Sequence, residues 1–327
     1  MNTTPTRKRI LSGVQPSGKL HLGNYFGAIR QHIALQDIGE CFYFIADYHS
    51  MTSLQDANIL RDNVRDVALD YLALGLDPNK AAFFRQSDVP EVTELTWFLS
   101  TVTGMGLLER AHSYKDKVAR GISPSVGLFT YPILMAADIL IYRSNVVPVG
   151  QDQVQHLEMT RDMAGSFNST YKTDLFPLPE AKLDVAAVVP GIDGKKMSKS
   201  YGNTIDIFAE GKHLKKVVMS IVTDSTPLEA PKNPDTCNVF AIYSLFATEA
   251  EKADLAAKYR AGGLGYGTAK TMVYDKIEAY FAAARAKRKE LLNNLDHVEA
   301  VLQQGAAKAR AEAQKTMDLA RKVVGLR

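Results

Sequence analysis

Apolar residues in the first half of the chain alternate between short continuous runs and longer stretches with helical spacing. The runs at 41–46, 81–84 and 146–149 are four to six residues long, which is typical of buried parallel strands, and the segment 9–14 is predicted to be the first strand. Between them, apolar residues recur every three or four positions, which predicts helices. Strands that alternate with helices predict an α/β fold with a doubly wound, Rossmann-like parallel sheet.

The helices expected between these strands follow from the same spacing. One begins near Leu22, one extends from Leu60 to Tyr71 and is closed by Gly75, and others cover 91–103 and 128–142. A further helix bears His156 and Glu158. The polar segment 104–127 contains glycine, and a solvated connection is expected there.

From about Phe208 onward the strand pattern disappears. Apolar spacing there predicts helices around Ala241–Phe246, over 272–292 and over 298–324. We therefore predict a nucleotide-binding catalytic domain at 1–203 and an all-helical domain at 204–327. The last helix could pack back on the first domain.

Composition limits the class of protein. The chain has 327 residues and a formal net charge of +3, which excludes a strongly basic nucleic-acid coat and leaves RNA contact to local patches. Cys41 and Cys237 show no metal-ligand spacing, so no metal site is expected. Because the sequence also shows no secretory signal and no apolar run of membrane-spanning length, a cytoplasmic protein is expected.

A basic pentapeptide, Lys196-Met197-Ser198-Lys199-Ser200, is the first candidate for chemistry. Its two lysines are three positions apart and can reach one phosphate cluster from a single loop, while the two serines add hydroxyl donors. Cations aimed at charge that grows in a transition state accelerate a reaction. The neighbouring glycines predict a mobile loop. The alternative is a solvated surface turn.

A second candidate is the segment Pro16–Asn24, which joins a predicted strand to a predicted helix. Such a turn presents backbone N–H groups to an anion. His21 and Asn24 fall three apart in the first helical turn and share a face. Gly23 would let a flat adenine ring approach the backbone. A merely polar helix turn is the alternative for His21.

Polar residues also follow two other predicted strands. Asp47, Tyr48 and His49 come after the strand at 41–46, and Gly150 follows the strand at 146–149. Open α/β sheets place ligands at this edge. Asp152 could accept hydrogen bonds from sugar hydroxyls, or it could cap the following helix.

One carboxylate lies on an apolar helix face. Asp138 shares a stripe of the helix at 128–142 with Tyr131, Met135 and Tyr142. A buried carboxylate is costly unless a donor reaches it. A substrate N–H is one such donor; the protein's own backbone or an arginine is the alternative.

Together these segments resemble the signature motifs of class I aminoacyl-tRNA synthetases. Their order and spacing are similar to those of the bacterial tryptophanyl-tRNA synthetases over essentially the whole chain. The matching segments are Pro16–Asn24, Leu134–Leu140, Val149–Gln153, His156 with Glu158, Arg161 with Asp162, and Lys196–Ser200. The chain departs from the wider pattern at Asn24, where the signature has a second histidine, and at Leu11, where some relatives have an aromatic residue.

The resemblance implies roles for particular residues. The implied ATP contacts are Gln15, Pro16, Ser17, Gly23, Asn24, Gly150, Gln151, Asp152, Val189, Lys196, Met197, Ser198, Lys199 and Ser200. The implied tryptophan contacts are Asp138, as acceptor of the indole N–H, with Met135, His49, Gln153, Val149 and Gln15. The implied catalytic residues are Lys196, Lys199, Lys117 and His21.

The resemblance also implies an activity. Tryptophan would be activated by ATP, with Mg²⁺ carried on the phosphates, and then transferred to tryptophan-specific tRNA. A homodimer and an anticodon-binding helical domain are the family expectation. Three alternatives are a tyrosine-specific synthetase, a small-molecule nucleotidyltransferase and a non-catalytic RNA-binding or regulatory paralogue. Since indole offers one donor and no acceptor, a single carboxylate suits tryptophan better than a phenol.

Overall fold

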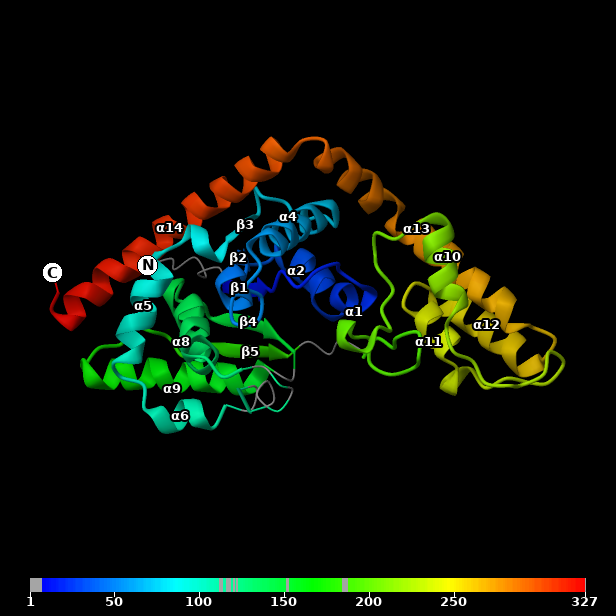
Figure 1. Cartoon of the computed structure of the whole chain (residues 1–327), viewed down its shortest axis with the longest axis horizontal. Helices are drawn as coiled ribbons and strands as arrows, with labels where there is room; N and C mark the ends of the chain where they lie inside the picture. The colour runs from blue at the N-terminus through cyan, green and yellow to red at the C-terminus, as the bar shows by residue number, and fades with distance from the viewer. Residues whose placement is uncertain are drawn as a thin grey trace, which may run out of the picture. The chain divides into compact units, whose positions relative to one another are not determined.

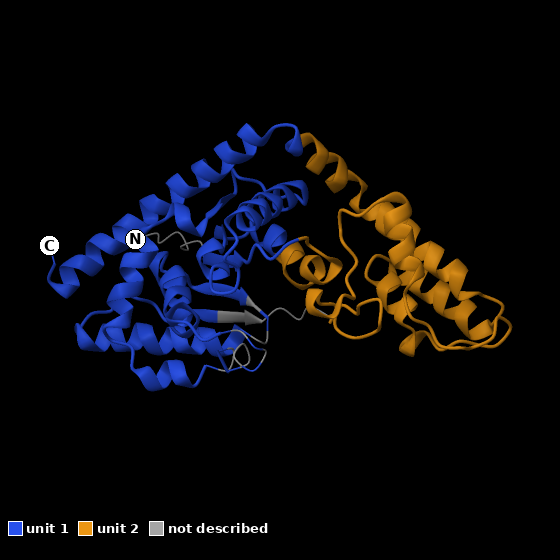
Figure 2. Cartoon of the chain, in the orientation of Figure 1, with its two compact units in different colours: residues 1–18, 32–184, 291–327 blue, residues 19–31, 185–290 orange. Residues whose placement is uncertain are grey.

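The computed structural model describes residues 8–111, 114–115, 119, 121, 123–150, 153–183 and 188–326. The chain forms two compact units (Figure 2). Unit 1 consists of Met1–Gly18, His32–Asp184 and Leu291–Arg327, and unit 2 of Lys19–Gln31 and Val185–Glu290. These compact units divide the chain differently from the boundary expected at 203/204, and the functional division into catalytic and anticodon-binding parts stays a prediction.

Unit 1 is built on a five-stranded sheet in which all neighbouring strands are parallel, and this confirms the predicted doubly wound fold. The strand order is β3-β2-β1-β4-β5. The strands are β1 (Arg9–Val14), β2 (Glu40–Ile45), β3 (Ala81–Arg85), β4 (Val146–Val149) and β5 (Glu180–Leu183). The first four are the predicted strands, and almost every described side chain in β2 and β3 is buried, as expected for strands covered on both faces.

The direction of the chain across the sheet reverses between β1 and β4. Strands β1 to β3 progress toward one edge, and β4 to β5 toward the other. Because parallel crossovers are right-handed, α4 (Ala57–Ala73) and α9 (Val154–Thr170) lie on opposite faces (Figure 1). The carboxyl ends of β1 and β4 therefore flank the crevice where such sheets bind ligands.

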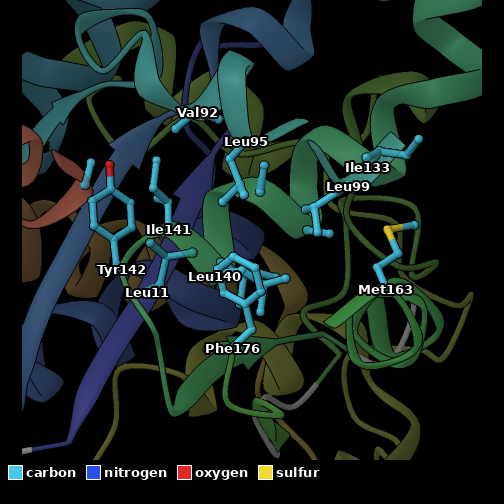
Figure 3. Close-up of a cluster of buried hydrophobic side chains, with 14 of the residues drawn as sticks. Leu11, Val92, Leu95, Leu99, Ile133, Leu140, Ile141, Tyr142, Met163 and Phe176 are labelled. Carbon is cyan, nitrogen blue, oxygen red and sulfur yellow. The ribbon is translucent and has the colours of Figure 1, made fainter. Parts of the chain in front are cut away.

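The core of unit 1 lies between the sheet and two helices, α5 (Glu91–Ser100) and α8 (Val126–Ile141). Leu95 and Leu99 of α5 meet Ile133 and Leu140 of α8 in this cluster, which also includes Leu11 (Figure 3). A short helix, α6 (Met105–Glu109), lies in the segment expected to be a connection. Five residues are too few to produce a recognisable period.

The long helix α14 (Leu295–Val324) packs on β3, so it covers an edge strand of the sheet. The approach is close, since a Cβ atom at Gly305 would lie 1.9 Å from the Phe83 carbonyl oxygen. Two arginines add ion pairs at opposite ends of the helix: Arg85 pairs with Glu299 at 2.6 Å, and Arg321 pairs with Glu94 at 2.5 Å.

Unit 2 contains no strand among its described residues beyond 208, as predicted. Its helical segments are α1 (Leu22–Asn24), a π-helical turn (Tyr25–Ile29), α10 (Gly211–Met219), α11 (Asn238–Ser244), α12 (Glu249–Ala261) and most of α13 (Tyr266–Leu292). The helical segment that begins at Leu22 continues along the chain into α2 (Arg30–Leu35). Rings of Tyr25, Phe26, Phe246, Tyr280 and Phe281 pack edge to face, which fastens the segment after His21 to α13.

Candidate active site

The structure brings the two signature segments together within unit 2. The backbone around His21 pairs with residues 205–207, because Leu22 N donates to Ile205 O at 3.0 Å and Ile207 N donates to Leu20 O at 3.2 Å. Met197, in the middle of the pentapeptide, is buried, and its Sδ accepts a hydrogen bond from Gly23 N at 3.4 Å. The predicted meeting of two distant segments is therefore present.

His21 is buried at the start of the short helix. Burial, and then the charge of Lys199, lower the pKa of His21 to about 4. The imidazole is therefore neutral at pH 7 and offers one N–H donor. A Cβ atom at Gly23 would lie 2.9 Å from the His21 ring, so this ring position requires glycine two residues later.

The pentapeptide presents its charged side chains to solvent from an anchored backbone. Lys196 and Lys199 are exposed, whereas Met197 N donates to the buried Val189 at its carbonyl oxygen, at 2.9 Å. Ser198 Oγ and Ser200 Oγ lie 2.9 Å apart. Two cations and two hydroxyls on one loop form an arrangement suited to phosphate.

In unit 1, the predicted ATP contacts lie at the carboxyl ends of β1 and β4. Gln15, Pro16 and Ser17 form a turn closed by a 2.9 Å hydrogen bond from Ser17 N to Gln15 O. Gly150 follows β4 and accepts a hydrogen bond from Gln153 N, also at 2.9 Å. Because β1 and β4 are neighbours, both turns lie at the switch point of the sheet. Lys117, Gln151 and Asp152 lie outside the described residues, as does the side chain of Val149.

Asp138 forms the centre of a buried polar cluster in unit 1. Only 2% of the residue is exposed. His49 Nε2 lies 2.8 Å from Asp138 Oδ2, and Gln86 Nε2 donates to both carboxylate oxygens at 2.9 Å. Among the described residues, the partners of this carboxylate are thus two side chains, rather than the backbone or arginine considered from the sequence. Burial raises the pKa of Asp138, and the His49 and Gln86 contacts oppose that rise.

The Asp138 carboxylate can accept a further hydrogen bond. Within the described part of the chain, Oδ1 accepts from Gln86 alone, and a carboxylate oxygen has two lone pairs. Met135 lies one turn before Asp138 on α8 and is half-buried. Tyr131 lies two turns before Asp138, with its hydroxyl 2.6 Å from His156 Nε2 and its ring edge-on to His49. An N–H on an apolar ring would suit this cluster.

Asp47 connects the two turns that carry His49 and Gln86. It begins α3 (Asp47–Ser50), directly after β2, and its carboxylate accepts hydrogen bonds from the backbone N–H and the hydroxyl of Ser87. Ser87 lies in the single turn η2 (Gln86–Asp88), after β3. Asp47 therefore ties the turn that carries His49 to the turn that carries Gln86.

Gln86, Tyr131 and His156 were not among the predicted site residues. Gln86 could have been found from its position, because it is the first polar uncharged residue after β3, at the same sheet edge as His49. Tyr131 lies on the apolar stripe of Asp138. His156 belongs to a motif used only for the resemblance.

Several basic residues of the C-terminal helices have structural partners. Arg285 is buried and bonds to Glu278 at 2.7 Å, while Arg310 pairs with Glu91 at 2.9 Å. Lys308 donates to the Pro78 carbonyl. With the Arg321 ion pair, four basic residues in the helices at 272–292 and 298–324 thus have partners within the protein. Their positive charge does not require RNA as a partner.

Among the described residues, no group of three or more histidine, cysteine, aspartate or glutamate side chains is arranged to hold a metal ion. None of the helices formed by those residues combines the length and apolar character needed to cross a membrane.

Several known proteins are similar to this chain over nearly its whole length. A family model described as tRNA synthetases class I (W and Y) matches residues 3–282. The chain is 59% identical over 320 residues to the tryptophan--tRNA ligase of Fusobacterium nucleatum, covering 98% of each chain, and 58% identical to that of Rhodopirellula baltica, covering 98% and 100%. The crystal structure of Campylobacter jejuni tryptophanyl-tRNA synthetase complexed with ADP and tryptophane superposes with a TM-score of 0.93 at 53% identity, covering 97% of this chain and 100% of that one.

Proposed function

The chain belongs to the class I tRNA synthetases (W and Y), and we propose that it attaches tryptophan to tryptophan-specific tRNA in two ATP-dependent steps. The observation that carries the choice of amino acid is the buried Asp138, held by His49 and Gln86 with acceptor capacity to spare. Indole presents a single N–H donor, which one carboxylate can read.

In the first step, a carboxylate oxygen of tryptophan attacks the α-phosphorus of ATP. A new O–P bond forms and the bond from the α-phosphorus to the bridging oxygen breaks, so tryptophanyl-adenylate and pyrophosphate result. Lys196 and Lys199 stabilise the negative charge that develops on the leaving pyrophosphate, with Lys117 as a third assigned cation. His21 donates a neutral N–H to a phosphate oxygen.

The remaining ATP contacts position the nucleotide. The segments Gln15–Ser17 and Gly150–Asp152 are assigned to ribose and phosphate, and Gly23 and Val189 to adenine. Mg²⁺ carried with ATP would partly neutralise the phosphate charge, and no protein ligand is assigned to it. This chemistry consists of positioning and electrostatic stabilisation.

In the second step, a hydroxyl of the terminal tRNA ribose attacks the adenylate carbonyl, and AMP leaves. No covalent intermediate with the enzyme is needed. The helical region after residue 203 is assigned to anticodon binding, and the protein to the cytoplasm.

A homodimer is part of the same proposal. Trp97, Met105 and Val126 of unit 1 are 69%, 62% and 80% exposed. They lie on α5, α6 and the start of α8, and α8 packs against both α5 and α6. Large exposed apolar side chains are typical of surfaces that another protein covers.

Amino-acid-dependent exchange of pyrophosphate into ATP tests the activity. We expect exchange with tryptophan and none above background with tyrosine or phenylalanine. Exchange with tyrosine alone would support the tyrosine-specific alternative, and no exchange with any amino acid would support a non-catalytic paralogue. Charging of a tryptophan-tRNA transcript, with a tyrosine-tRNA transcript as control, tests the second step.

A further inference from the structure

Asn203 lies three residues beyond the pentapeptide, and its buried side chain holds the loop together. Its Oδ1 accepts a hydrogen bond from Ser198 N at 2.8 Å, and its Nδ2 donates to Asp193 Oδ1 at 2.7 Å and to Lys196 O at 3.2 Å. We propose that Asn203 is a positioning residue for adenylate formation, since it fixes the backbone from which Lys196 and Lys199 reach the phosphates. This inference rests on the proposed function.

The three contacts require an amide of this length. The side chain must accept from one backbone N–H and donate to both a carboxylate and a carbonyl, which is what an asparagine amide can do. An aspartate at position 203 would have no donor and would bring a second carboxylate against Asp193. Only 2% of Asn203 is exposed, so water cannot readily replace the lost partners.

The surroundings are shaped to receive this amide. A Cβ atom at Gly191 would lie 2.3 Å from Asn203 Nδ2, so position 191 must be glycine while the amide is in place. Asp193 also accepts from Lys195 N at 3.0 Å, and the hydrogen bond from Asn203 is the main cause that lowers the pKa of Asp193. The carboxylate is therefore ionised at neutral pH and is a strong acceptor for the amide.

The base of the loop is fixed to the rest of unit 2. Asn203 O accepts from Ile192 N at 3.0 Å, and Asn238 Nδ2, at the start of α11, donates to Gly191 O at 2.9 Å. The backbone of the loop is thus held at both sides, while the side chains of Lys196 and Lys199 are exposed. Loss of the amide would misplace the lysines without touching the buried carboxylate cluster of unit 1.

The test is a set of four variants: Asn203→Ala, Asn203→Asp, Asp193→Asn and the double exchange Asp193→Asn with Asn203→Asp. We expect Asn203→Ala to lower the kcat of tryptophan-dependent ATP–pyrophosphate exchange by about 10- to 100-fold, as for a small misplacement of catalytic groups. The KM for tryptophan should stay within about 2-fold of wild type. Asn203→Asp should be worse, because two carboxylates would face each other.

The two variants that carry Asp193→Asn distinguish a positioning role of Asn203 from a general loss of structure. Asp193→Asn keeps an oxygen that accepts from Asn203 and Lys195, so its kcat should fall only about 2- to 5-fold. In the double exchange, the new amide at 193 can donate to the new carboxylate at 203, and kcat should recover at least about 5-fold relative to Asn203→Asp alone. Thermal melting of each variant verifies folding.

The outcomes are decisive in both directions. Wild-type kcat in Asn203→Ala would overturn the proposal, and so would an equal loss in Asn203→Asp and the double exchange, even if Asn203→Ala fails to fold. A rise in the KM for tryptophan with unchanged kcat would also overturn it. Failure of wild-type protein to exchange pyrophosphate would refute the proposed function itself and is seen before any variant is made.

Discussion

Replacement of Asp138 by alanine should remove the ability to distinguish an indole N–H. Asp138 is buried and is held by His49 Nε2 at 2.8 Å and Gln86 Nε2 at 2.9 Å, so it has a fixed position. The comparison substrate is the tryptophan analogue whose ring nitrogen is replaced by sulfur, β-(benzothiophen-3-yl)alanine. It has nearly the same shape but lacks the donor, so the two substrates differ in the one interaction assigned to Asp138.

The expected magnitude follows from the chemistry of the contact. A hydrogen bond to a charged group contributes about 1.5–3 kcal/mol, which corresponds to roughly 10- to 150-fold in kcat/KM. The wild-type preference for tryptophan over the sulfur analogue should have this size, and in Asp138→Ala it should fall to within about 3-fold of unity. Asp138→Asn keeps an acceptor without charge, so an intermediate preference of about 2- to 10-fold is expected.

The assay is ATP–pyrophosphate exchange with each substrate, for wild type and both variants. Asp138→Ala also leaves His49 and Gln86 without their acceptor, so its free energy of unfolding should fall by about 1–3 kcal/mol for each unpaired group. This loss of stability does not affect the substrate preference, because the kcat/KM values for both substrates are measured on the same protein. A preference that survives intact in Asp138→Ala would mean that another group reads the ring.

Two further changes test other parts of the site and of the fold. Gly23→Ala should lower the exchange rate by at least about 10-fold, since its Cβ would lie 2.9 Å from the His21 ring; Gly27→Ala, whose Cβ would meet no atom within 4 Å, should keep wild-type activity. Burial lowers the pKa of His32 to about 4, below its unfolded value near 6.5, so the unfolded state binds the extra proton and the free energy of unfolding falls as pH decreases from 6.5 to 4. Urea unfolding at pH 7 and 5 should show a smaller pH dependence in His32→Asn than in wild type, by at most about 1.4 kcal/mol per pH unit.

The strands could be predicted because they are buried on both faces. Residues 41–46 and 81–84 are short continuous apolar runs, rich in aromatic residues, and this length and composition favour buried strands over helices. The helices α10 and α12 were not predicted. Helix α12 is rich in charged residues and alanine, so its helical period is weak in the sequence. Helix α10 has only nine residues, which is short for a periodicity window, although its buried Leu214 and Val218 are four positions apart.

The site was predictable where a motif is local and not where it is assembled from distant strands. His21 and Lys199 come from two contiguous segments whose pairing is characteristic, and the structure brings these segments together. Gln86 reaches Asp138 only because β3 and α8 are neighbours in the folded core, and nothing near residue 86 in the sequence indicates a carboxylate at 138. The side-chain contacts of Asn203 were not predicted either, although its partners lie within ten residues of it in the sequence, because they depend on how the loop folds back on itself.

The central claim is that the segment around His21 and the pentapeptide form one site for the triphosphate. The most direct measurement is the single-turnover rate of tryptophanyl-adenylate formation in Lys199→Ala, with the affinity for tryptophan measured by calorimetry and Lys195→Ala, an exposed neighbour, as control. We expect a loss of about 10²- to 10³-fold in rate for Lys199→Ala, unchanged tryptophan affinity and a near-normal rate for Lys195→Ala. An unchanged rate in Lys199→Ala would contradict the account.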